Sequence, residues 1–268
     1  SSFIGGGVVA AADMGSTPTT NGPFDNTKRD QKAEIVIGSD AGMKTTVKVF
    51  DVSGMAMSTP GAVAAAVASF TPFSTAAASY QGGVSLSVAR INADPILDIV
   101  VGASANGGSL VDVWAWNNAS AAALSSLSAN GVGFAAFTDA SRTAPVQVAA
   151  LDANSDGLAD TILAVQGPGG TTGEFRAFAI TSVSPLEVSP PTMVPGSFLS
   201  PYFIASIRNP SPALPLVAKT LGLFDPSAAH FYLKNSNLVA PGDVNDFGFT
   251  VNLSGGAPLS GDWNGDGT

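Results

Sequence analysis

Oxygen-bearing side chains gather in one short stretch of the chain, residues 152–160, at a spacing that suits a metal ion. Asp152, Asn154, Asp156 and Asp160 stand at positions 1, 3, 5 and 9 of this stretch, and Gly157 at position 6 allows a sharp backbone turn. Ca²⁺ takes six to eight oxygen ligands in a flexible shell, and alternating Asp and Asn side chains supply most of them. The stretch therefore predicts a calcium-binding loop. The alternative is an ordinary turn without an ion, because Asp, Asn and Gly favour turns in any case.

The residues behind this loop distinguish it from two common calcium motifs. An EF-hand requires a glutamate at position 12 and a helix on each side, and a dockerin-type loop also needs an acid there. Position 12 is Leu163, inside the short apolar run 161–165. Because this run is partly β-branched, it predicts a buried strand and not a helix. The loop is therefore expected to lead directly into a strand.

The pattern recurs along the chain and predicts the architecture. Aligned on position 9, Glu34, Asp98, Asp160 and Lys219 are separated by 64, 62 and 59 residues. Each is followed by an apolar strand, and each repeat has a further strand before the loop and another after it. The strands before the loops are 8–11, 84–88, 146–148 and 202–205, and the later ones are 47–50, 111–114, 175–178 and 231–233. Repeats of this length that hold several short strands suit the blades of a β-propeller.

These residues resemble FG-GAP/VCBS-type repeats, the calcium-binding propeller blades of integrin heads and of many bacterial surface proteins. The stretches that carry the resemblance are 148–160, 34–51, 222–237 and 260–268. The resemblance implies an all-β protein, a β-propeller of four-stranded antiparallel blades of about 60 residues. We expect a single propeller-type region over 1–268, with units at roughly 3–80, 81–140, 141–198 and 199–256 and an incomplete fifth at 257–268.

The same resemblance implies which residues hold Ca²⁺. In the third loop it adds the Leu158 carbonyl to the four side chains named above. The matching ligands of the other loops are Asp262, Asn264 and Asp266 in the fifth, Asn26, Asp30 and Glu34 in the first, and Asn92, Asp94 and Asp98 in the second. The first loop also contains an apparent insertion, 14–24, and Asp13 lies at the end of the strand before it.

Two of the loops carry basic residues where the pattern wants an oxygen. Arg90 stands at position 1 of the second loop, and we expect its guanidinium to pair with the carboxylates and replace the ion. The fourth loop has Arg208 at the first position and Lys219 at the last, so we expect no metal there. Calcium binding is therefore expected at the third and fifth loops, with the first loop as a further candidate.

Composition agrees with an extracellular all-β protein. The chain has 268 residues, of which 45% are hydrophobic and 12% charged, with 30 Gly, 18 Pro and no Cys. This is enough for a packed core but rich in turn-forming residues, and the lack of cysteine excludes disulfides. A net charge of −9 without a basic stripe argues against nucleic acid as a partner. Calcium sites of extracellular modules are often weak, which favours a secreted or cell-surface location.

No targeting or membrane segment is visible in the sequence. The longest weakly apolar run, 62–70, is far shorter than the roughly 20 residues of a spanning helix, and we expect a strand or short helix at a blade edge. The chain begins at Ser1 without a methionine and stops inside a calcium motif at Thr268. Four repeats and one leading strand do not obviously close a ring. We therefore expect a segment of a longer array.

The residues needed for catalysis are nearly absent. His230 is the only histidine and there is no cysteine, so Cys-His chemistry and an ordinary zinc site are excluded. The carboxylates cluster where calcium explains them. The glycine-rich stretch 167–173 lies between two predicted strands and opens no helix, so it predicts a hairpin turn and not a phosphate-binding loop. We expect a protein that is not an enzyme.

The function expected from the sequence is a non-catalytic, extracellular, calcium-binding propeller module with a structural, adhesion or surface-assembly role. Its partners would be other extracellular or surface proteins. The alternative is a carbohydrate-binding propeller, or the accessory domain of a polysaccharide-degrading enzyme, with glycans as partners. That alternative needs an exposed aromatic such as Trp116 to stack on a sugar ring. Trp114 and Trp116, and likewise Phe175 and Phe178, have alternating or near-alternating strand positions, so one of each pair is expected to face a neighbouring blade, and core packing is the favoured role.

Overall fold

A computed structural model of the chain describes β-strands and several of the turns between them. Side chains are described through residue 179, apart from those of 124–126 and 174. The described residues are 6–15, 25, 30, 32–52, 66–73, 80–92, 94, 96–116, 124–127, 133–137, 145–151, 159, 161–166, 174–181, 184–187, 192–193, 203–207, 220–225, 230–233 and 247–250.

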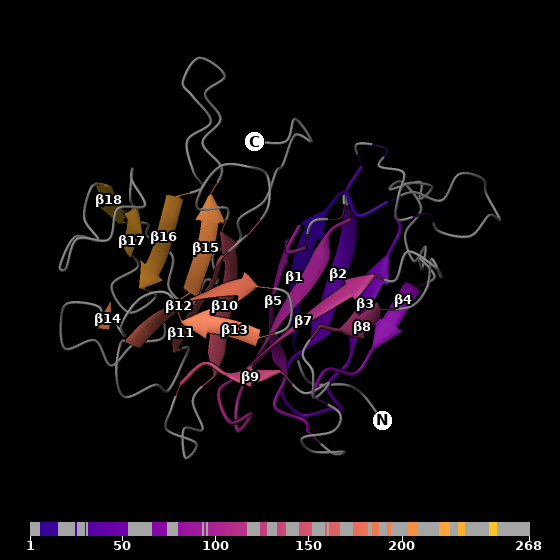
Figure 1. Cartoon of the computed structure of the whole chain (residues 1–268), viewed down its shortest axis with the longest axis horizontal. Helices are drawn as coiled ribbons and strands as arrows, with labels where there is room; N and C mark the ends of the chain where they lie inside the picture. Colours follow the sequence, from indigo (N-terminus) through magenta and orange to yellow (C-terminus); the bar gives the residue numbers. More distant parts are fainter. Residues whose placement is uncertain are drawn as a thin grey trace.

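The described residues form four antiparallel sheets, each from consecutive strands of the chain (Figure 1). The first sheet contains β1 (Gly7–Ala12), β2 (Glu34–Ser39), β3 (Val47–Phe50) and β4 (Ala66–Phe70). The second contains β5 (Val84–Ala89), β6 (Asp98–Ala103), β7 (Leu110–Trp116), β8 (Leu124–Ser126) and the short β9 (Phe134–Ala135). The third contains β10 (Val146–Leu151), β11 (Thr161–Gln166), β12 (Glu174–Thr181), β13 (Ser184–Glu187) and the short β14 (Thr192–Met193). The fourth contains β15 (Phe203–Ile207), β16 (Thr220–Asp225), β17 (His230–Leu233) and β18 (Phe247–Thr250).

The prediction of an all-β fold with antiparallel sheets is confirmed. Within each sheet four strands pair in chain order, and β9 and β14 pair in addition with β7 and β12. The run 62–70 contains an outer strand, β4, and not a helix. The described part of the chain contains no helix, and so none that could cross a membrane. The expected turn at 167–173 lies outside the described residues.

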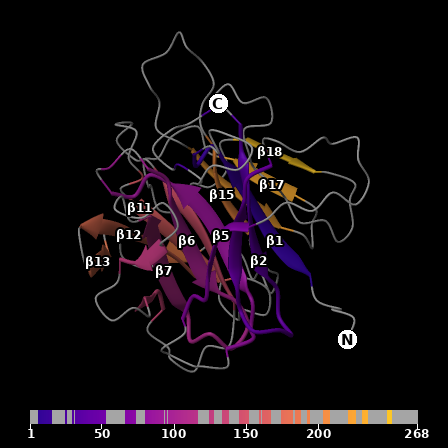
Figure 2. The ribbon, with the colours of Figure 1, turned by 90° about the vertical axis from the view of Figure 1, so that its right-hand side faces the viewer.

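The sheets pack on one another face to face in chain order. In Figure 1 the first two lie on the right and the last two on the left, and Figure 2 shows β1 and β2 beside β5 and β6. We call the face that meets the following sheet the forward face, and the opposite face the rear face. The first strands lie next to one another in the succession β1, β5, β10 and β15.

Alternating side chains build a separate core at each of the first two sheet-to-sheet contacts. The forward face of the first sheet, with Val36, Val49 and Phe70, packs on the rear face of the second, with Ile99 and Val101. In the same way, the forward face of the second sheet meets the rear face of the third. Its core includes Val100, Val113, Val148, Ile162 and Phe178. Because successive side chains of a strand point to opposite faces, the second sheet packs on the first sheet with one set and on the third sheet with the other.

Glycine and serine allow the first strand of one sheet to approach the forward face of the preceding sheet closely. A Cβ on Gly38 would collide with Val84 of β5, and a Cβ on Gly102 would lie 2.6 Å from the Val146 carbonyl oxygen of β10. Ser85 Oγ donates a hydrogen bond to that same oxygen at 2.7 Å. Gly38 and Gly102 hold equivalent places, since they pair with Val47 and Val111 in their own sheets.

Candidate functional site

Two buried carboxylates occupy equivalent positions where the second strand of a sheet begins. Glu34 is the first residue of β2 and pairs with Ala12, the last residue of β1. Asp98 is the first residue of β6 and pairs with Ala89, the last residue of β5. Both side chains are fully shielded from solvent. We call these places the first junction and the second junction.

Each carboxylate accepts two backbone hydrogen bonds from the segment that leaves the preceding strand. Glu34 Oε2 accepts from the N–H groups of Met14 at 2.7 Å and Gly15 at 3.1 Å. Asp98 Oδ2 accepts from Ile91 at 3.1 Å and Asn92 at 3.3 Å. The donors stand two and three residues beyond the end of the strand in both cases. One oxygen of each carboxylate therefore anchors the chain as it leaves the strand.

The second oxygen of each carboxylate is available to another positive partner. Glu34 Oε1 and Asp98 Oδ1 are buried and have no hydrogen-bond partner among the residues that the structure describes. A buried acceptor that is left unpaired costs free energy, which a proton or a bound cation can offset. The two junctions differ in which other charged groups surround this oxygen.

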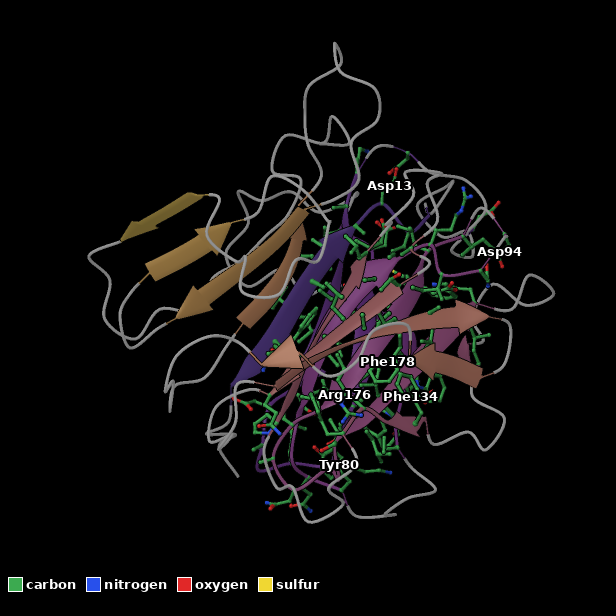
Figure 3. The ribbon with its side chains drawn as sticks, turned by 60° about the vertical axis from the view of Figure 1, so that its left-hand side comes forward. Asp13, Tyr80, Asp94, Phe134, Arg176 and Phe178 are labelled. Atoms are coloured by element: carbon green, nitrogen blue, oxygen red, sulfur yellow. The ribbon has the colours of Figure 1, made fainter. Side chains whose placement is uncertain are left out.

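Acidic side chains surround the first junction. Asp13 follows Ala12, which pairs with Glu34, and Asp51 follows Phe50, which pairs with Ile35. Strand register therefore places a carboxylate on each side of Glu34. The pKa of Glu34 is raised to about 8, mainly by burial; the Met14 N–H lowers it, and the charges of Asp51, Asp13 and Asp30 contribute to the rise. Figure 3 shows Asp13 at the end of the sheets opposite to Tyr80.

The second junction has a different set of neighbours at the corresponding places. Arg90 stands where the first junction has Asp13, and the buried Ala115 stands where it has Asp51. Burial raises the pKa of Asp98 to about 7, with a smaller contribution from the charge of Asp94, and the Ile91 and Asn92 N–H groups lower it. Only the first junction thus has an acidic residue beside its buried carboxylate on both neighbouring strands.

The candidate ligands of the second loop are used in hydrogen bonds within the loop. Asn92 Oδ1 accepts from the Asp94 N–H at 3.0 Å, and Asp94 Oδ1 accepts from the Ile96 N–H at 2.9 Å. These short-range bonds are typical of Asx turns. Asn92, Asp94 and Asp98 thus lie together in one loop. Their side chains accept hydrogen bonds from backbone N–H groups of that same loop.

The expected pairing of Arg90 with the acids of its loop was wrong. Within the described residues Arg90 makes no ion pair with Asp94 or Asp98, and its Nε is buried without a hydrogen-bond partner. Its carbonyl accepts a hydrogen bond of 2.6 Å from the Ala159 N–H, which joins the second loop to the third. Backbone donors, and not a guanidinium, therefore occupy the Oδ2 atom of Asp98.

The remaining candidate ligands are only partly described. Asp30 accepts from the Lys32 N–H at 3.0 Å, and its other oxygen lies 3.8 Å from the Lys32 ammonium, so both of its oxygens are engaged. Asn26, the third-loop residues Asp152, Asn154, Asp156, Leu158 and Asp160, and the fifth-loop residues Asp262, Asn264 and Asp266 all lie outside the described residues. In the part that is described, no three acidic side chains converge closely enough to hold a metal.

The alignment of the repeats on position 9 needs one correction. Ile162 and Ala164 face the second sheet, as Ile99 and Val101 face the first, so Thr161 and not Asp160 stands in the phase of Asp98. Thr161 pairs with Leu151 of β10. Likewise the fourth sheet begins its second strand at Thr220, one residue after Lys219. Asp152, which follows Leu151, becomes the sequence equivalent of Asp13.

The two described tryptophans lie in the sheet interfaces. Trp116 is buried, and Trp114 of the second sheet stacks on Phe70 of the first with ring centroids 4.4 Å apart. Phe134 of the second sheet similarly meets Phe178 of the third edge-on at 4.9 Å. The core-packing role expected of Trp116 is therefore confirmed, and a sugar-stacking role for it is wrong.

Removing the Asp98 carboxylate should destabilise the second sheet. In Asp98→Ala the Ile91 and Asn92 N–H groups lose their acceptor, which should lower the free energy of unfolding by about 2 kcal/mol. Urea denaturation at about pH 5.5, below the pKa of this group, measures the loss. Asp98→Asn keeps one acceptor oxygen and should recover most of it. Equal stability of Asp98→Ala and the wild type would show that these bonds contribute nothing.

Comparison of the chain with protein-family models, with curated proteins and with solved structures found no match. The resemblance to FG-GAP/VCBS repeats thus rests on the residues of this chain alone. The geometry adds two equivalent junctions, of which the first is rich in carboxylates and the second is closed by backbone hydrogen bonds.

Proposed function

We propose that this chain is a non-catalytic, extracellular β-propeller module that binds Ca²⁺ and serves a structural, adhesion or surface-assembly role. The propeller part is supported by four antiparallel sheets that follow one another in chain order. Each described contact sets a forward face on a rear face, and the first strands follow one another as β1, β5, β10 and β15. Radial repetition of four-stranded sheets produces this kind of packing.

The observation that carries the calcium proposal is the first junction. Glu34 is fully buried, one of its oxygens has no hydrogen-bond partner, and the charges of Asp13, Asp30 and Asp51 act on it. Carboxylate oxygens are the ligands that Ca²⁺ prefers, and a bound cation would offset the repulsion among them. Glu34 would be a ligand of the ion, and Asp13 and Asp51, which do not converge with it on one point, would have to approach it on binding. The third loop, with Asp152, Asn154, Asp156 and Asp160, is the second proposed site.

Calcium should stabilise the fold by mass action, because it binds the folded chain and not the unfolded one. At a hundredfold excess over the dissociation constant the gain is about 2.7 kcal/mol for each site. Thermal melting in Ca²⁺ and in EGTA should show a clear fall in the melting temperature on chelation. Calorimetric titration should show that Asp156→Ala removes one site, whereas Asp94→Ala leaves the stoichiometry unchanged.

Two results would overturn this proposal. One is a melting temperature that is the same in EGTA and in millimolar Ca²⁺. The other is a titration in which Asp156→Ala binds as many ions as the wild type. A site lost in Asp94→Ala would instead show that the second loop binds Ca²⁺ despite its internal hydrogen bonds.

A further inference from the structure

The segment that leaves β5 joins the second sheet to the third. Ala89, the last residue of β5, and Ile91 pack in the core between these two sheets, together with Ala159 of the third loop. The three residues are 4%, 5% and 2% exposed. Between Ala89 and Ile91, the carbonyl of Arg90 accepts a hydrogen bond of 2.6 Å from the Ala159 N–H. This bond therefore lies among buried apolar side chains, where a hydrogen bond is stronger than in water.

Two hydrogen bonds in series connect the Asp98 carboxylate to the third loop. The Ile91 N–H donates to Asp98 Oδ2 at 3.1 Å, and the Arg90 carbonyl of the same peptide unit accepts from the Ala159 N–H. The Ala159 N–H in turn shares a peptide unit with the Leu158 carbonyl. Because hydrogen bonds in a chain polarise one another, the charge of Asp98 strengthens each acceptor along this series.

The Leu158 carbonyl stands where a calcium loop uses its main chain. Leu158 is at position 7 of the loop that starts at Asp152, and calcium loops of this spacing take a backbone carbonyl as the ligand at that position. The hydrogen-bond series from Asp98 thus ends on the peptide unit that carries this candidate ligand.

The second loop is held differently at the corresponding place. Ile96 stands two residues before β6, as Ala159 stands two residues before β11. The Ile96 N–H donates to Asp94 Oδ1 of its own loop at 2.9 Å, whereas the Ala159 N–H donates to the preceding sheet. The second loop is therefore held at this point by its own side chain, and the third loop by its neighbour.

We propose that Asp98 is a positioning residue for the third loop, because it fixes the Arg90 carbonyl that holds the Ala159 N–H. The second loop, for which we expect no ion, then orients the carbonyl that the next loop offers to Ca²⁺. The inference deepens the calcium-binding role proposed above, and it rests on that role only for the use of the Leu158 carbonyl. The hydrogen-bond series itself does not depend on calcium.

Amide hydrogen exchange in EGTA tests the positioning role without calcium. In the wild type the buried Ala159 amide should exchange about as slowly as that of Ile162 in β11. In Asp98→Ala the Ala159 amide should exchange about tenfold faster relative to Ile162, because its acceptor is no longer fixed. A general loss of stability speeds up both amides alike, so the ratio of the two rates isolates the local effect.

Two further variants complete the exchange experiment. Asp98→Asn keeps an oxygen that can accept from the Ile91 N–H, so the ratio should stay close to the wild-type value. Asp94→Ala is the matched control, because it removes an acceptor from the same loop but frees the Ile96 N–H and not that of Ile91. It should leave the ratio unchanged.

Three exchange results would overturn the proposal. Fast exchange of the Ala159 amide in the wild type does so, even where Asp98→Ala fails to fold. An unchanged ratio in Asp98→Ala is the second such result. The third is an equal change in Asp94→Ala, because the loop as a whole and not Asp98 would then hold Ala159.

Calorimetric titration with Ca²⁺ tests the effect on the site. At the site that Asp156→Ala removes, Asp98→Ala should raise the dissociation constant about tenfold, and Asp98→Asn should restore it. A changed exchange ratio with an unchanged dissociation constant would overturn the role of the Leu158 carbonyl. Where the wild type has no such site, the calcium proposal fails, and the exchange ratio still decides whether Asp98 positions the third loop.

Discussion

Replacing Gly102 with alanine should destabilise the fold by about 3 kcal/mol. The added Cβ would lie 2.5 Å from Ser85 Oγ, 2.6 Å from the Val146 carbonyl oxygen and 2.9 Å from Val148 Cγ1. The Val146 oxygen belongs to the backbone of β10 and cannot rotate away, so the second and third sheets must separate. That separation would also lengthen the 2.7 Å hydrogen bond between Ser85 and Val146. Urea denaturation of the whole chain measures the change.

Gly7→Ala is the matched control for this prediction. Gly7 also lies in a strand, but a Cβ there would meet its nearest atom, the Gly38 carbonyl oxygen, at an ordinary distance of 3.4 Å. Alanine at such a place restricts the unfolded chain, and the change should be neutral or stabilising by about 0.5 kcal/mol. Equal effects of the two substitutions would contradict the close approach of β5 and β10.

Short apolar runs between turn-forming residues were sufficient to predict most of the described strands. The run after Glu34 is β2 and the run after Asp98 is β6, each starting at the predicted carboxylate. The run 47–50 is β3 without any change of bounds. These strands could be predicted because each has a buried face of β-branched residues.

The surroundings of Glu34 could not be predicted from any local motif. Asp51 lies far from Glu34 in the sequence, and only the register of β2 with β3 brings it near. The sequence feature that could have indicated these surroundings is Asp51, an acid directly after the predicted strand 47–50. Register also explains the wrong equivalence of Asp160 with Asp98, because a match of sequence motifs does not fix which residues pair across a hairpin.

The stability of the calcium-free protein should fall as the pH rises towards 8, and Glu34 should be a main cause. The pKa of Glu34 is raised from its ordinary value of 4.5 to about 8 in the folded chain. Between these values the folded chain keeps a proton that the unfolded chain has released. Its contribution is therefore complete below about pH 4.5 and lost by about pH 8, with a slope of up to about 1.4 kcal/mol per pH unit.

Glu34→Gln should remove this dependence. Glutamine keeps an oxygen that can accept from the Met14 and Gly15 N–H groups, and its amide can donate towards the nearby carboxylates. In EGTA at pH 8 the variant should be more stable than the wild type, by a few kcal/mol. Added Ca²⁺ should reverse the order, because the cation stabilises the ionised carboxylate and competes with the proton. Urea denaturation at several pH values, with and without Ca²⁺, measures both effects.

The Asp98→Asn variant distinguishes the contribution of Asp98 to the pH dependence of stability from that of Glu34. The pKa of Asp98 is raised from 3.8 to about 7, so its contribution is lost before that of Glu34 as the pH rises. The Asp98→Asn variant should therefore have a flatter profile below pH 7 and keep the fall between pH 7 and 8, whereas Glu34→Gln should lose that last part. A wild type that is equally stable at pH 7 and pH 8 in EGTA would show that burial and the charges of Asp13 and Asp51 do not raise the pKa of Glu34. The ionised carboxylates of the first junction would then cost the fold little, and a divalent cation would have no repulsion among them to offset.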